Sequence, residues 1–349
     1  MATIYDIAKA AGVSSAAVSM ALNNKKGVSE ETRRRILTIA ENMKYVANDT
    51  AKQLSTQRSK TVVLFVSAMS YEYFNSSFYF DIIKYISMGL GQKLNINIQM
   101  STLDQDAEMI EQLATANKVL AYVFIGTRLS PAFIGKLIGD TPAIFFNKPY
   151  ALGRNSYSVS FDNQRAAYLL TKYLINLGHR DIAYLGYVPG AIPAENRMIG
   201  YKSALEEAGV PLNTDRVFQT EYLSVFGYST IKDMILLDTP LPSAIICGND
   251  LIAVGAMKAL LEFGFQVPGD VSVVGIDNLQ FTDMLQVPLT TINVNCEKIG
   301  LAIAALLLGI SENKESGRHV MVNVSLTERK SAGRYNPNRR SCRKELSEN

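Results

Sequence analysis

Apolar residues recur every three or four positions in the first 45 residues, and this spacing predicts three short helices. A capping box at Thr3–Asp6 opens the first helix. Its inward face then holds Ile7, Ala8 and Ala11. The apolar pattern stops after each helix and resumes within a few residues, so the connections are expected to be short turns.

Gly12 supplies the first turn, and Ser14 caps the second helix, whose buried side holds Val18 and Leu22. Ser29 opens the third helix, which has acidic residues in its first turn. The inward positions of this third helix are Ile36, Ile39, Ala40 and Met43. Two helices joined by a glycine turn and backed by a third are typical of a helix-turn-helix domain. Residues 1–46 are therefore expected to form an all-α head.

From residue 61 onward, short apolar runs alternate with helical stretches and predict an α/β body. Alternation of this kind is typical of parallel sheets with right-handed crossovers. Because the runs fall into two sets, we expect two doubly wound parallel-sheet lobes, with ligands at the carboxyl ends of the strands. The expected strands are 61–67, 96–101, 119–126 and 142–147 in the first set, and 158–161, 182–186, 244–248 and 271–276 in the second.

The segment between head and body, 47–60, is polar and basic and is interpreted as a linker. Asn48 is a candidate cap for a short helix with Ala51, Leu54 and Ser55 on one side. A helix of about eight residues is too short to be stable alone in water, so this segment is expected to be disordered when free.

Charge divides the chain as the helical pattern does. Residues 1–60 hold ten Lys and Arg against five Asp and Glu, whereas the other 289 residues hold 25 against 27. A small basic module on a nearly neutral body is typical of a polyanion-binding head. A solvated helical face would give the same charge, so charge alone does not decide between the two.

Composition excludes several classes of protein. The longest apolar run, 301–310, falls short of the roughly 20 residues of a membrane span, and the first residues lack the pattern of a signal peptide. Three scattered cysteines indicate reduced thiols in a cytosolic protein. Only two histidines are present, so we expect neither a metal site nor a cofactor.

Catalytic motifs are weak in this sequence. The triplet at 179–181, HRD, resembles a kinase catalytic loop, but Gly186 stands where that loop requires Asn. A helix that ends at Gly178 and leads into a strand explains the triplet better. The sequence has no G-x-S-x-G, no P-loop and no G-x-G-x-x-G, so an enzyme is not expected.

Six segments together resemble a known family. They are "TIYDIAKAAGVSSAAVSMALN", "VSEETRRRIL", "LGHRDIAYLG", "RMIGYKSALEEAGV", "NDLIAVGAMKAL" and "VPGDVSVVGIDN" with "PLTTI" after it. In order and spacing, from residue 3 to about 333, the chain is similar to the LacI/GalR (lactose/galactose repressor) family. The resemblance implies a homodimeric transcription regulator, expected to be a repressor, that binds a pseudo-palindromic DNA operator. A small molecule, a sugar in the first place, would control it from between two lobes similar to periplasmic sugar-binding proteins.

The pattern and the resemblance together place the domain boundaries. We expect a head at 1–46, a linker at 47–60, an amino-terminal lobe of 61–160 and 293–319, a carboxy-terminal lobe of 161–292 and 320–333, and a disordered basic tail at 334–349.

The resemblance assigns base contacts to Ser15, Ala16 and Met20. Many family members carry Arg at the position of Met20, and Met and Ala reach only apolar base edges such as the thymine methyl. The expected phosphate contacts are Tyr5, Ser14, Ser19 and Asn23. The expected linker contacts are Asn48, Ala51, Lys52 and Leu54. Leu54 would be a wedge in the minor groove, the alternative being that it packs on the body.

The resemblance also places an effector site. Arg197 matches the ligand-gripping Arg, Asn249 and Asp277 match polar contacts at strand ends, and Tyr222 matches a stacking aromatic. Phe78 and Tyr79 stand for first-lobe contacts, and Asp162 is a further candidate. Structural alternatives are a helix cap for Asn249, a turn cap for Asp277 and a core position for Tyr222. Val294 stands where the family has another polar contact, so a purine or nucleoside, or a phosphoprotein partner, stays open beside a sugar.

Overall fold

The computed structural model describes residues 4–22, 27–43, 61–67, 77–91, 94–101, 119–126, 130–148, 150, 152, 155–314 and 317–342. The chain divides into two compact units, Met1–Ser59 and Lys60–Asn349. Within the described residues, no helix is both long and apolar enough to cross a membrane.

The described part of the amino-terminal unit consists of α1 (Ile4–Ala11), α2 (Ser15–Leu22) and α3 (Glu30–Asn42). The three helices pack around Ile7, Val18 and Ile36, which are fully buried. Periodic apolar positions thus form one small core, as the spacing predicts. Met43 differs from the prediction: it follows the last residue of α3 and is 38% exposed.

The turns of this unit use the predicted residues. Gly12 adopts a positive φ of 65° between α1 and α2, a conformation that glycine reaches without strain. The hydroxyl oxygen of Ser14 accepts a hydrogen bond from the Ala17 N–H at 3.2 Å, and Ser29 caps α3 by accepting from the Thr32 N–H at 3.3 Å. These two caps satisfy donors that the helix starts would otherwise leave unpaired.

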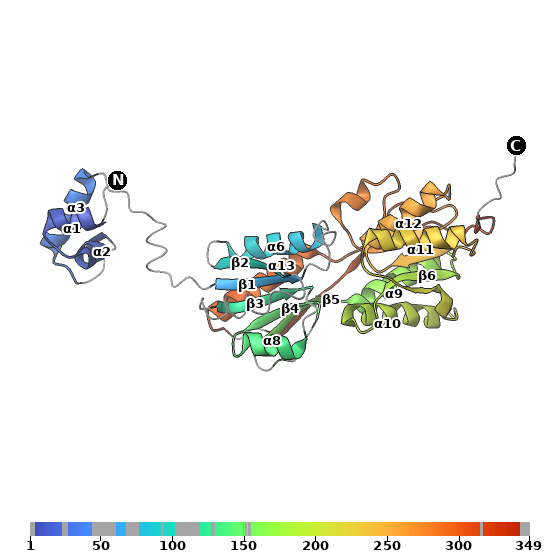
Figure 1. The fold of residues 1–349 in the computed structure, drawn as a ribbon, viewed down its shortest axis with the longest axis horizontal. Coiled ribbons are helices and arrows are strands. Elements are labelled where there is room, and N and C mark those ends of the chain that lie inside the picture. The colour runs from blue at the N-terminus through green and yellow to red at the C-terminus, as the bar shows by residue number, and fades with distance from the viewer. Residues whose placement is uncertain are drawn as a thin grey trace. The chain divides into compact units, whose positions relative to one another are not determined.

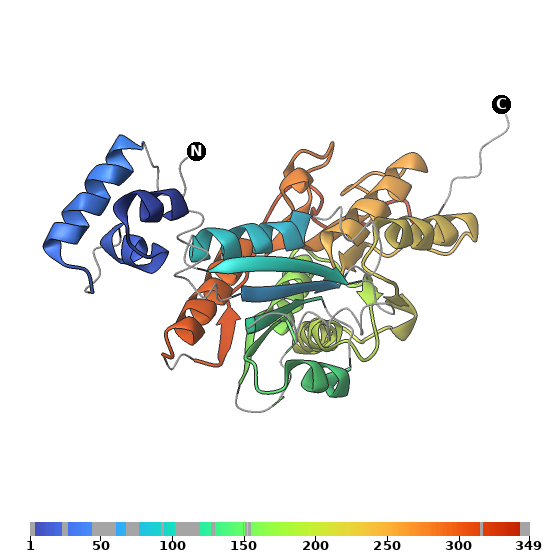
Figure 2. The same cartoon turned by 60° about the vertical axis from the view of Figure 1, so that its left-hand side comes forward.

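The first lobe of the second unit is a six-stranded parallel sheet with the order β11-β5-β4-β3-β1-β2. Its strands are β1 (Thr61–Ser67), β2 (Asn95–Ser101), β3 (Val119–Ile125), β4 (Ala143–Phe146), β5 (Ser156–Phe161) and β11 (His319–Val322). Helices α6 (Ser77–Leu90) and α13 (Cys296–Ser311) cover one face, and α8 (Pro131–Ile138) covers the other (Figure 1). The turned view keeps α8 on the opposite side of the strands from α6 (Figure 2).

The second lobe repeats this plan with the strand order β12-β10-β9-β8-β6-β7. Its strands are β6 (Ile182–Tyr187), β7 (Val217–Gln219), β8 (Ala244–Cys247), β9 (Ser272–Asp277), β10 (Thr290–Asn293) and β12 (Ser325–Thr327). Its helices are α9 (Asn163–Asn176) and α10 (Ile192–Glu207) on one face, and α11 (Ser224–Leu236) and α12 (Asp250–Glu262) on the other (Figure 1). The edge strand β12 runs antiparallel to β10, so the prediction of parallel pairing fails at this edge.

The chain passes between the lobes at positions that only partly match the expected boundaries. The first passage follows β5, which ends at Phe161, so this strand belongs to the first sheet and not to the second set of strands in which the sequence pattern placed it. The second passage follows β10, which ends at Asn293. The third passage differs from the predicted boundary between residues 319 and 320. Strand β11 pairs with β5 of the first sheet as far as Val322, so residues 320–322 belong to the first lobe. This boundary depends on backbone pairing between β5 and β11, which are some 160 residues apart, so a local sequence pattern does not predict it.

The carboxy-terminal tail is a second correction. Residues 334–342 lie against the second lobe, where the Tyr335 N–H donates to the Leu177 carbonyl at 2.8 Å. The Arg340 guanidinium lies 3.9 Å from the centre of the Phe265 ring, and its backbone N–H donates to Asp270 at 2.8 Å. The prediction of disorder is wrong for residues 334–342. The second lobe provides hydrogen-bond and ring partners for them, and the composition of the tail alone does not reveal these partners. Residues 343–349 lie outside the described part.

Candidate effector-binding cleft and DNA-binding head

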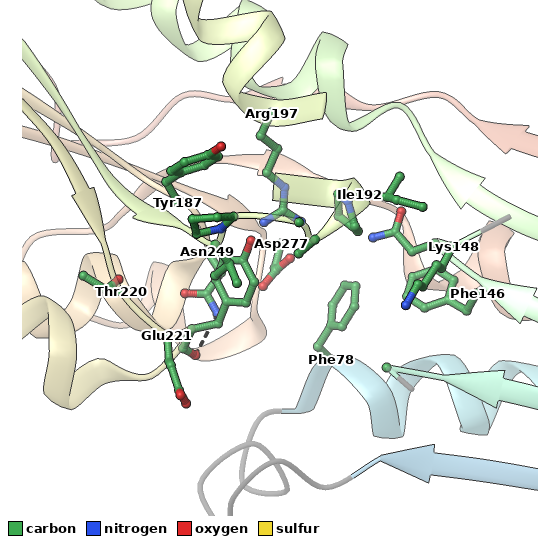
Figure 3. Close-up of a pocket in the computed structure, with 18 of the residues that line it drawn as sticks. Phe78, Phe146, Lys148, Tyr187, Ile192, Arg197, Thr220, Glu221, Asn249 and Asp277 are labelled. Atoms are coloured by element: carbon green, nitrogen blue, oxygen red, sulfur yellow. Dashed lines mark hydrogen bonds between the residues drawn. The ribbon is translucent and has the colours of Figure 1, made fainter. Parts of the chain in front are cut away.

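A cavity of about 790 Å³ lies between the two lobes of the second unit. The first lobe contributes Phe78, Tyr79, Gly126, Phe146, Asn147, Lys148 and Phe161. The second lobe contributes Tyr187–Pro193, Arg197, Gln219–Tyr222, Phe226, Asn249 and Asp277. Arg197, Asn249 and Asp277 gather on one side, and Phe78, Phe146 and Lys148 stand across from them (Figure 3). Most of these residues follow the carboxyl ends of β4, β6, β7, β8 and β9, where α/β lobes bind ligands.

Arg197 is the most constrained cation of this cavity. It extends from α10 and is only 6% exposed. Its Nε donates to Asn163 Oδ1 at 2.8 Å, and its Nη1 donates to the Gly248 carbonyl. The guanidinium also lies over the rings of Phe161 and Tyr222, with the guanidinium carbon 5.6 and 5.5 Å from the ring centres. Held from several sides, this charge faces the cleft in one orientation.

The network around Arg197 continues into the first lobe. Asn163, the first residue of α9, donates from Nδ2 to Asn147 Oδ1 at 2.6 Å and to the Phe161 carbonyl at 3.1 Å. Asn147 follows β4 and itself lines the cavity. A single buried amide therefore joins the arginine of one lobe to the end of a strand in the other.

Asn249 lines the cavity and also caps a helix. Its Oδ1 accepts from the Ile252 N–H at 2.9 Å, and its Nδ2 donates to the Tyr222 carbonyl at 3.1 Å. The helix-cap alternative is therefore seen in the structure, together with the position in the cavity wall. The amide fixes the Tyr222 loop as well as the start of α12.

Asp277 ends β9 with a positive φ of 132° and lies half-buried in the cavity wall. Burial raises its pKa well above the ordinary range, the neighbouring Asp250 adds to this effect, and Arg197 opposes it. Asp250 lies behind it, fully buried, and accepts from the Thr291 hydroxyl at 2.5 Å and from the Leu279 N–H at 2.9 Å. Burial raises the pKa of Asp250 to about 6, against the lowering effect of these hydrogen bonds.

The aromatic candidates lie where a flat ligand could contact them. Phe78 and Tyr79 belong to α6, and their rings meet edge to face with centres 5.4 Å apart. Tyr222 precedes α11, and its hydroxyl is buried and finds no hydrogen-bond partner among the described residues. The three residues line the same cavity from opposite lobes.

Asp162 differs from the expectation. It is not among the residues that line the cavity, and its carboxylate caps α9 by accepting from the Arg165 N–H at 2.8 Å. Its neighbour Asn163 instead carries the contact to Arg197. The sequence prediction chose the residue next to the important one, because both follow the same strand and only side-chain direction separates them.

Several residues that line the cavity were not predicted from the sequence. Position is the signal that could have found most of them, because they lie at or just after the carboxyl ends of predicted strands; these are Gly126, Phe146, Asn147, Lys148, Phe161, Tyr187 and Val188–Pro193. Gln219–Glu221 lie at the end of β7, which was not predicted, and Phe226 lies in the first turn of α11.

In the head, the predicted base-contacting residues lie on α2. Ala16 is exposed, and Ser15 and Met20 are half-buried. A Cβ placed on Gly27 would lie 2.9 Å from the Met20 sulfur, so this side chain packs beside the segment that leads into α3. Ser14 is exposed and Ser19 is half-buried, whereas Tyr5 is described only as part of the α1 backbone.

Other predictions fall beyond what the structure describes. Asn23, Asn48, Ala51, Lys52 and Leu54 lie outside the described residues, so their predicted DNA contacts stay predictions. Within the described ranges, no group of three or more His, Cys, Asp or Glu side chains is arranged to hold a metal ion.

Comparison with known proteins matches two parts of the chain to known families. Residues 3–48 match the family described as bacterial regulatory proteins, lacI family, and residues 171–332 match a periplasmic binding protein-like domain. The probable HTH-type transcriptional repressor ExuR of Bacillus subtilis is 29% identical over 342 residues, which cover 96% of this chain and 99% of ExuR.

Two solved structures have the same fold. The lac repressor dimer bound to operator and an anti-inducer superposes with a TM-score of 0.77 at 24% identity, covering 95% of this chain and 99% of that one. The transcriptional regulator CelR in complex with cellobiose gives a TM-score of 0.72 at 23% identity, covering 95% and 100%. With a helix-turn-helix head, two periplasmic-binding-protein-like lobes and relatives matched over nearly their whole length, the chain belongs to the LacI family of bacterial transcriptional regulators.

Proposed function

We propose that the protein is a homodimeric, cytoplasmic repressor that binds a specific DNA operator and responds to a small molecule held between its lobes. The observation that supports this best is the presence in one chain of a helix-turn-helix head and a two-lobed body around a cavity of about 790 Å³. The protein acts by binding rather than by catalysis.

The head supplies the DNA contacts. In this proposal α2 enters the major groove, where the small side chains of Ser15 and Ala16 let the helix approach the base edges and Met20 offers an apolar contact. Ser14, Ser19, Tyr5 and Asn23 contact phosphates and set the register. The linker residues Asn48, Ala51, Lys52 and Leu54 add minor-groove contacts, with Leu54 as the wedge.

A dimer follows from the geometry of operator binding, because two heads on a pseudo-palindrome require a two-fold axis. The lac repressor structure that shares this fold is a dimer on its operator. Two exposed apolar side chains of α6, Phe80 and Met88, give the first lobe a surface suited to a second copy. Effector binding that changes the closure of the lobes would alter the spacing of the heads, with a coupling of about 1–3 kcal/mol.

A sugar fits the cleft best. Arg197 and Asp277 offer charged partners for hydroxyls, and the rings of Phe78, Tyr79 and Tyr222 offer faces for the apolar side of a pyranose. CelR, which shares the fold, is seen with cellobiose. The many aromatic rings of the wall would also suit a purine or nucleoside, which is the second candidate effector.

The DNA-binding half is tested with an operator selected from random DNA by the full chain. Binding should fall steeply as salt rises, because phosphate contacts release counterions. A fragment that begins at Thr61 is the control and should not bind this operator. Equal binding by the fragment would disprove the role of the head.

The effector half is tested by thermal denaturation of the full chain in the presence of hexoses, disaccharides, nucleobases and nucleosides. A compound that binds the folded protein raises Tm by mass action. Arg197→Ala should abolish that rise while leaving operator binding without effector near normal. The sugar assignment fails if only nucleobases or nucleosides raise Tm, and the effector proposal fails if nothing in the panel does.

A further inference from the structure

Three consecutive arginines lie near the start of α3, and they do not share one environment. Arg34 and Arg35 are exposed, as arginines that contact DNA phosphates must be. Arg33 is only 9% exposed, which is rare for a charged side chain, in a domain whose apolar core is small. Because a buried charge costs free energy unless it is paired, the partners of Arg33 indicate what it does.

The buried partner of Arg33 lies at the carboxyl end of α2. The Arg33 Nη1 donates a hydrogen bond to the Ala21 carbonyl at 3.2 Å, and Ala21 itself is buried. The Arg33 Nε also lies 3.5 Å from a carboxylate oxygen of Glu30, one turn earlier on α3. The Glu30 side chain is 76% exposed, so water weakens this ion pair. The ion pair therefore adds little, whereas the buried hydrogen bond joins two helices.

Helix α2 has few means of its own to hold its carboxyl end. It is eight residues long, too short to be stable alone in water, and its buried residues are Val18 and Ala21. The last four carbonyls of a helix have no partner within that helix, and the helix dipole places a partial negative charge there. The last turn of α2 contains no basic residue. Arg33 of α3 therefore supplies both a hydrogen-bond donor and a positive charge to this helix end.

The position of α2 matters because Ser15, Ala16 and Met20 are the residues proposed to meet the base edges. Met20 directly precedes Ala21, so a shift of the Ala21 carbonyl moves the Met20 side chain as well. Base readout depends on the exact placement of side chains in the major groove, whereas attraction to phosphates depends mainly on charge. A loosened α2 would therefore lose sequence specificity and keep general affinity for DNA.

We propose that Arg33 is a positioning residue for DNA recognition: it holds the carboxyl end of α2 from inside the head and does not itself contact a phosphate. This inference rests on the proposed DNA-binding role of the head and adds the group that fixes the helix in the major groove. Among the ten Lys and Arg residues of 1–60, Arg33 thus contributes to specificity rather than to general attraction for DNA.

The first test is hydrogen–deuterium exchange of the full chain without DNA, followed by mass spectrometry on peptides from α1, α2 and α3. Arg33→Met keeps an aliphatic stem and removes the donors and the charge, so exchange in α2 should become about tenfold faster or more. Exchange in α1 and α3 should stay within about twofold. Arg34→Met is the matched control, because it removes the same charge at an exposed position of the same helix and should leave α2 unchanged. Equal acceleration in all three helices, or in none, would overturn the inference.

The second test compares binding of the full chain to an operator selected from random DNA with binding to unrelated DNA of equal length. Arg33→Met should weaken operator binding about tenfold and leave binding to unrelated DNA unchanged, together with its dependence on salt. Arg34→Met should keep the ratio of the two affinities. A lost phosphate contact would instead weaken binding to both DNAs alike and lower the slope of log affinity against log salt by about one. That pattern for Arg33→Met would reject its positioning role.

The outcome for the unchanged protein separates this inference from the proposed function. If the unchanged protein selects an operator and Arg33→Met binds it equally well, the positioning role fails and the DNA-binding proposal stands. If the unchanged protein selects no operator, the DNA-binding proposal fails and this inference fails with it.

Discussion

Asn163 donates a hydrogen bond from Nδ2 to Asn147 Oδ1 at 2.6 Å and thereby links the first residue of α9 to the end of β4. The same amide accepts from Arg197 Nε through its oxygen. Any ligand that moves Arg197 therefore acts on a contact between the two lobes. The bond is short and lies in a partly buried network, where the low local dielectric strengthens hydrogen bonds.

Replacing this amide should destabilise the fold. Asn163→Ala removes the acceptor of the buried Arg197 Nε and cuts the contact to Asn147, at a cost of about 1–3 kcal/mol in the free energy of unfolding. Denaturant unfolding of the full chain measures the loss. Asn176→Ala, at an exposed position at the end of the same helix, should change stability by less than about 0.5 kcal/mol. Equal effects of the two variants would contradict the link.

The pair of buried carboxyls predicts a dependence of stability on pH. The pKa values of Asp277 and Asp250 are both raised in the fold, chiefly by burial. Between about pH 4 and pH 6 the folded protein holds a proton on Asp250 that the unfolded chain has lost, so the stability from this carboxyl is present at low pH and is lost as pH rises through 6. Asp277 acts in the same direction, because burial raises its pKa well above the ordinary range. Buried His179, whose pKa is lowered by burial, has the opposite effect below its ordinary pKa.

Asp277→Asn isolates the carboxyl effect, because His179 is common to both proteins and cancels in the comparison. The variant has no charge to bury, so at pH 8 it should be more stable than the unchanged protein in the absence of effector, by an amount on the order of 1–2 kcal/mol. At pH 3.5, below the ordinary Asp pKa of about 3.9, both the folded and the unfolded chain hold the proton, so the advantage should be nearly gone. Thermal unfolding at the two pH values measures it, and an advantage that is the same at both would show that the Asp277 charge is not disfavoured.

Glycines set the distance between paired helices. A Cβ on Gly255 of α12 would lie 1.9 Å from the Ser224 carbonyl oxygen at the start of α11. Gly255→Ala should therefore force the two helices apart. The free energy of unfolding should fall by about 3 kcal/mol or more, which is the high end of the range seen when a core is overpacked. Gly135→Ala is the control, since its Cβ would meet only a Leu152 methyl at 3.9 Å in the interior of α8. There the gain in helix propensity should stabilise by about 0.5–1 kcal/mol.

The tail offers a stability prediction of its own. Arg340→Ala removes the guanidinium from the Phe265 ring and from the Gly264 carbonyl that it donates to. We expect the free energy of unfolding to fall by about 1–2 kcal/mol. Arg334→Ala, at an exposed position in the same segment, should be close to neutral. Similar Tm values for the two variants would mean that the tail adds nothing to the lobe.

The head predicts a change of DNA sequence preference rather than a loss of binding. Met20→Arg introduces a bidentate donor on α2 and should favour guanine at the base pair that it reaches. Selection from random DNA with the two proteins in parallel shows the difference. Leu37→Arg is the control: it adds the same charged side chain at an exposed position on α3 and should keep the original preference. Identical selected sites for Met20→Arg and the unchanged protein would show that residue 20 does not face the bases.

Local periodicity determined much of this protein from the sequence alone. Apolar residues recur at helical spacing within each helix of the head, because a short helix has only one face to bury. Ile7, Val18 and Ile36, one from each helix, form the core of the head. The predicted strands of both lobes appear as apolar runs because a parallel sheet is covered on both faces. The short strands β7, β10, β11 and β12 were not predicted. Arg197 and Asp277 were placed at the cleft by the resemblance of the sequence to the LacI/GalR family rather than by local periodicity, and both line the cavity.

The tertiary structure decided what depends on contacts between distant segments. The pairing of β11 with β5, the docking of the tail and the amide link of Asn163 all join residues that are remote or of unremarkable pattern in the sequence. Asp162 and Asn163 are neighbours with the same local signal, and only the packing of α9 against β4 and α10 sends one to a helix cap and the other to Arg197. A side chain's direction is set by the three-dimensional environment of its strand or helix, which a one-dimensional pattern does not contain.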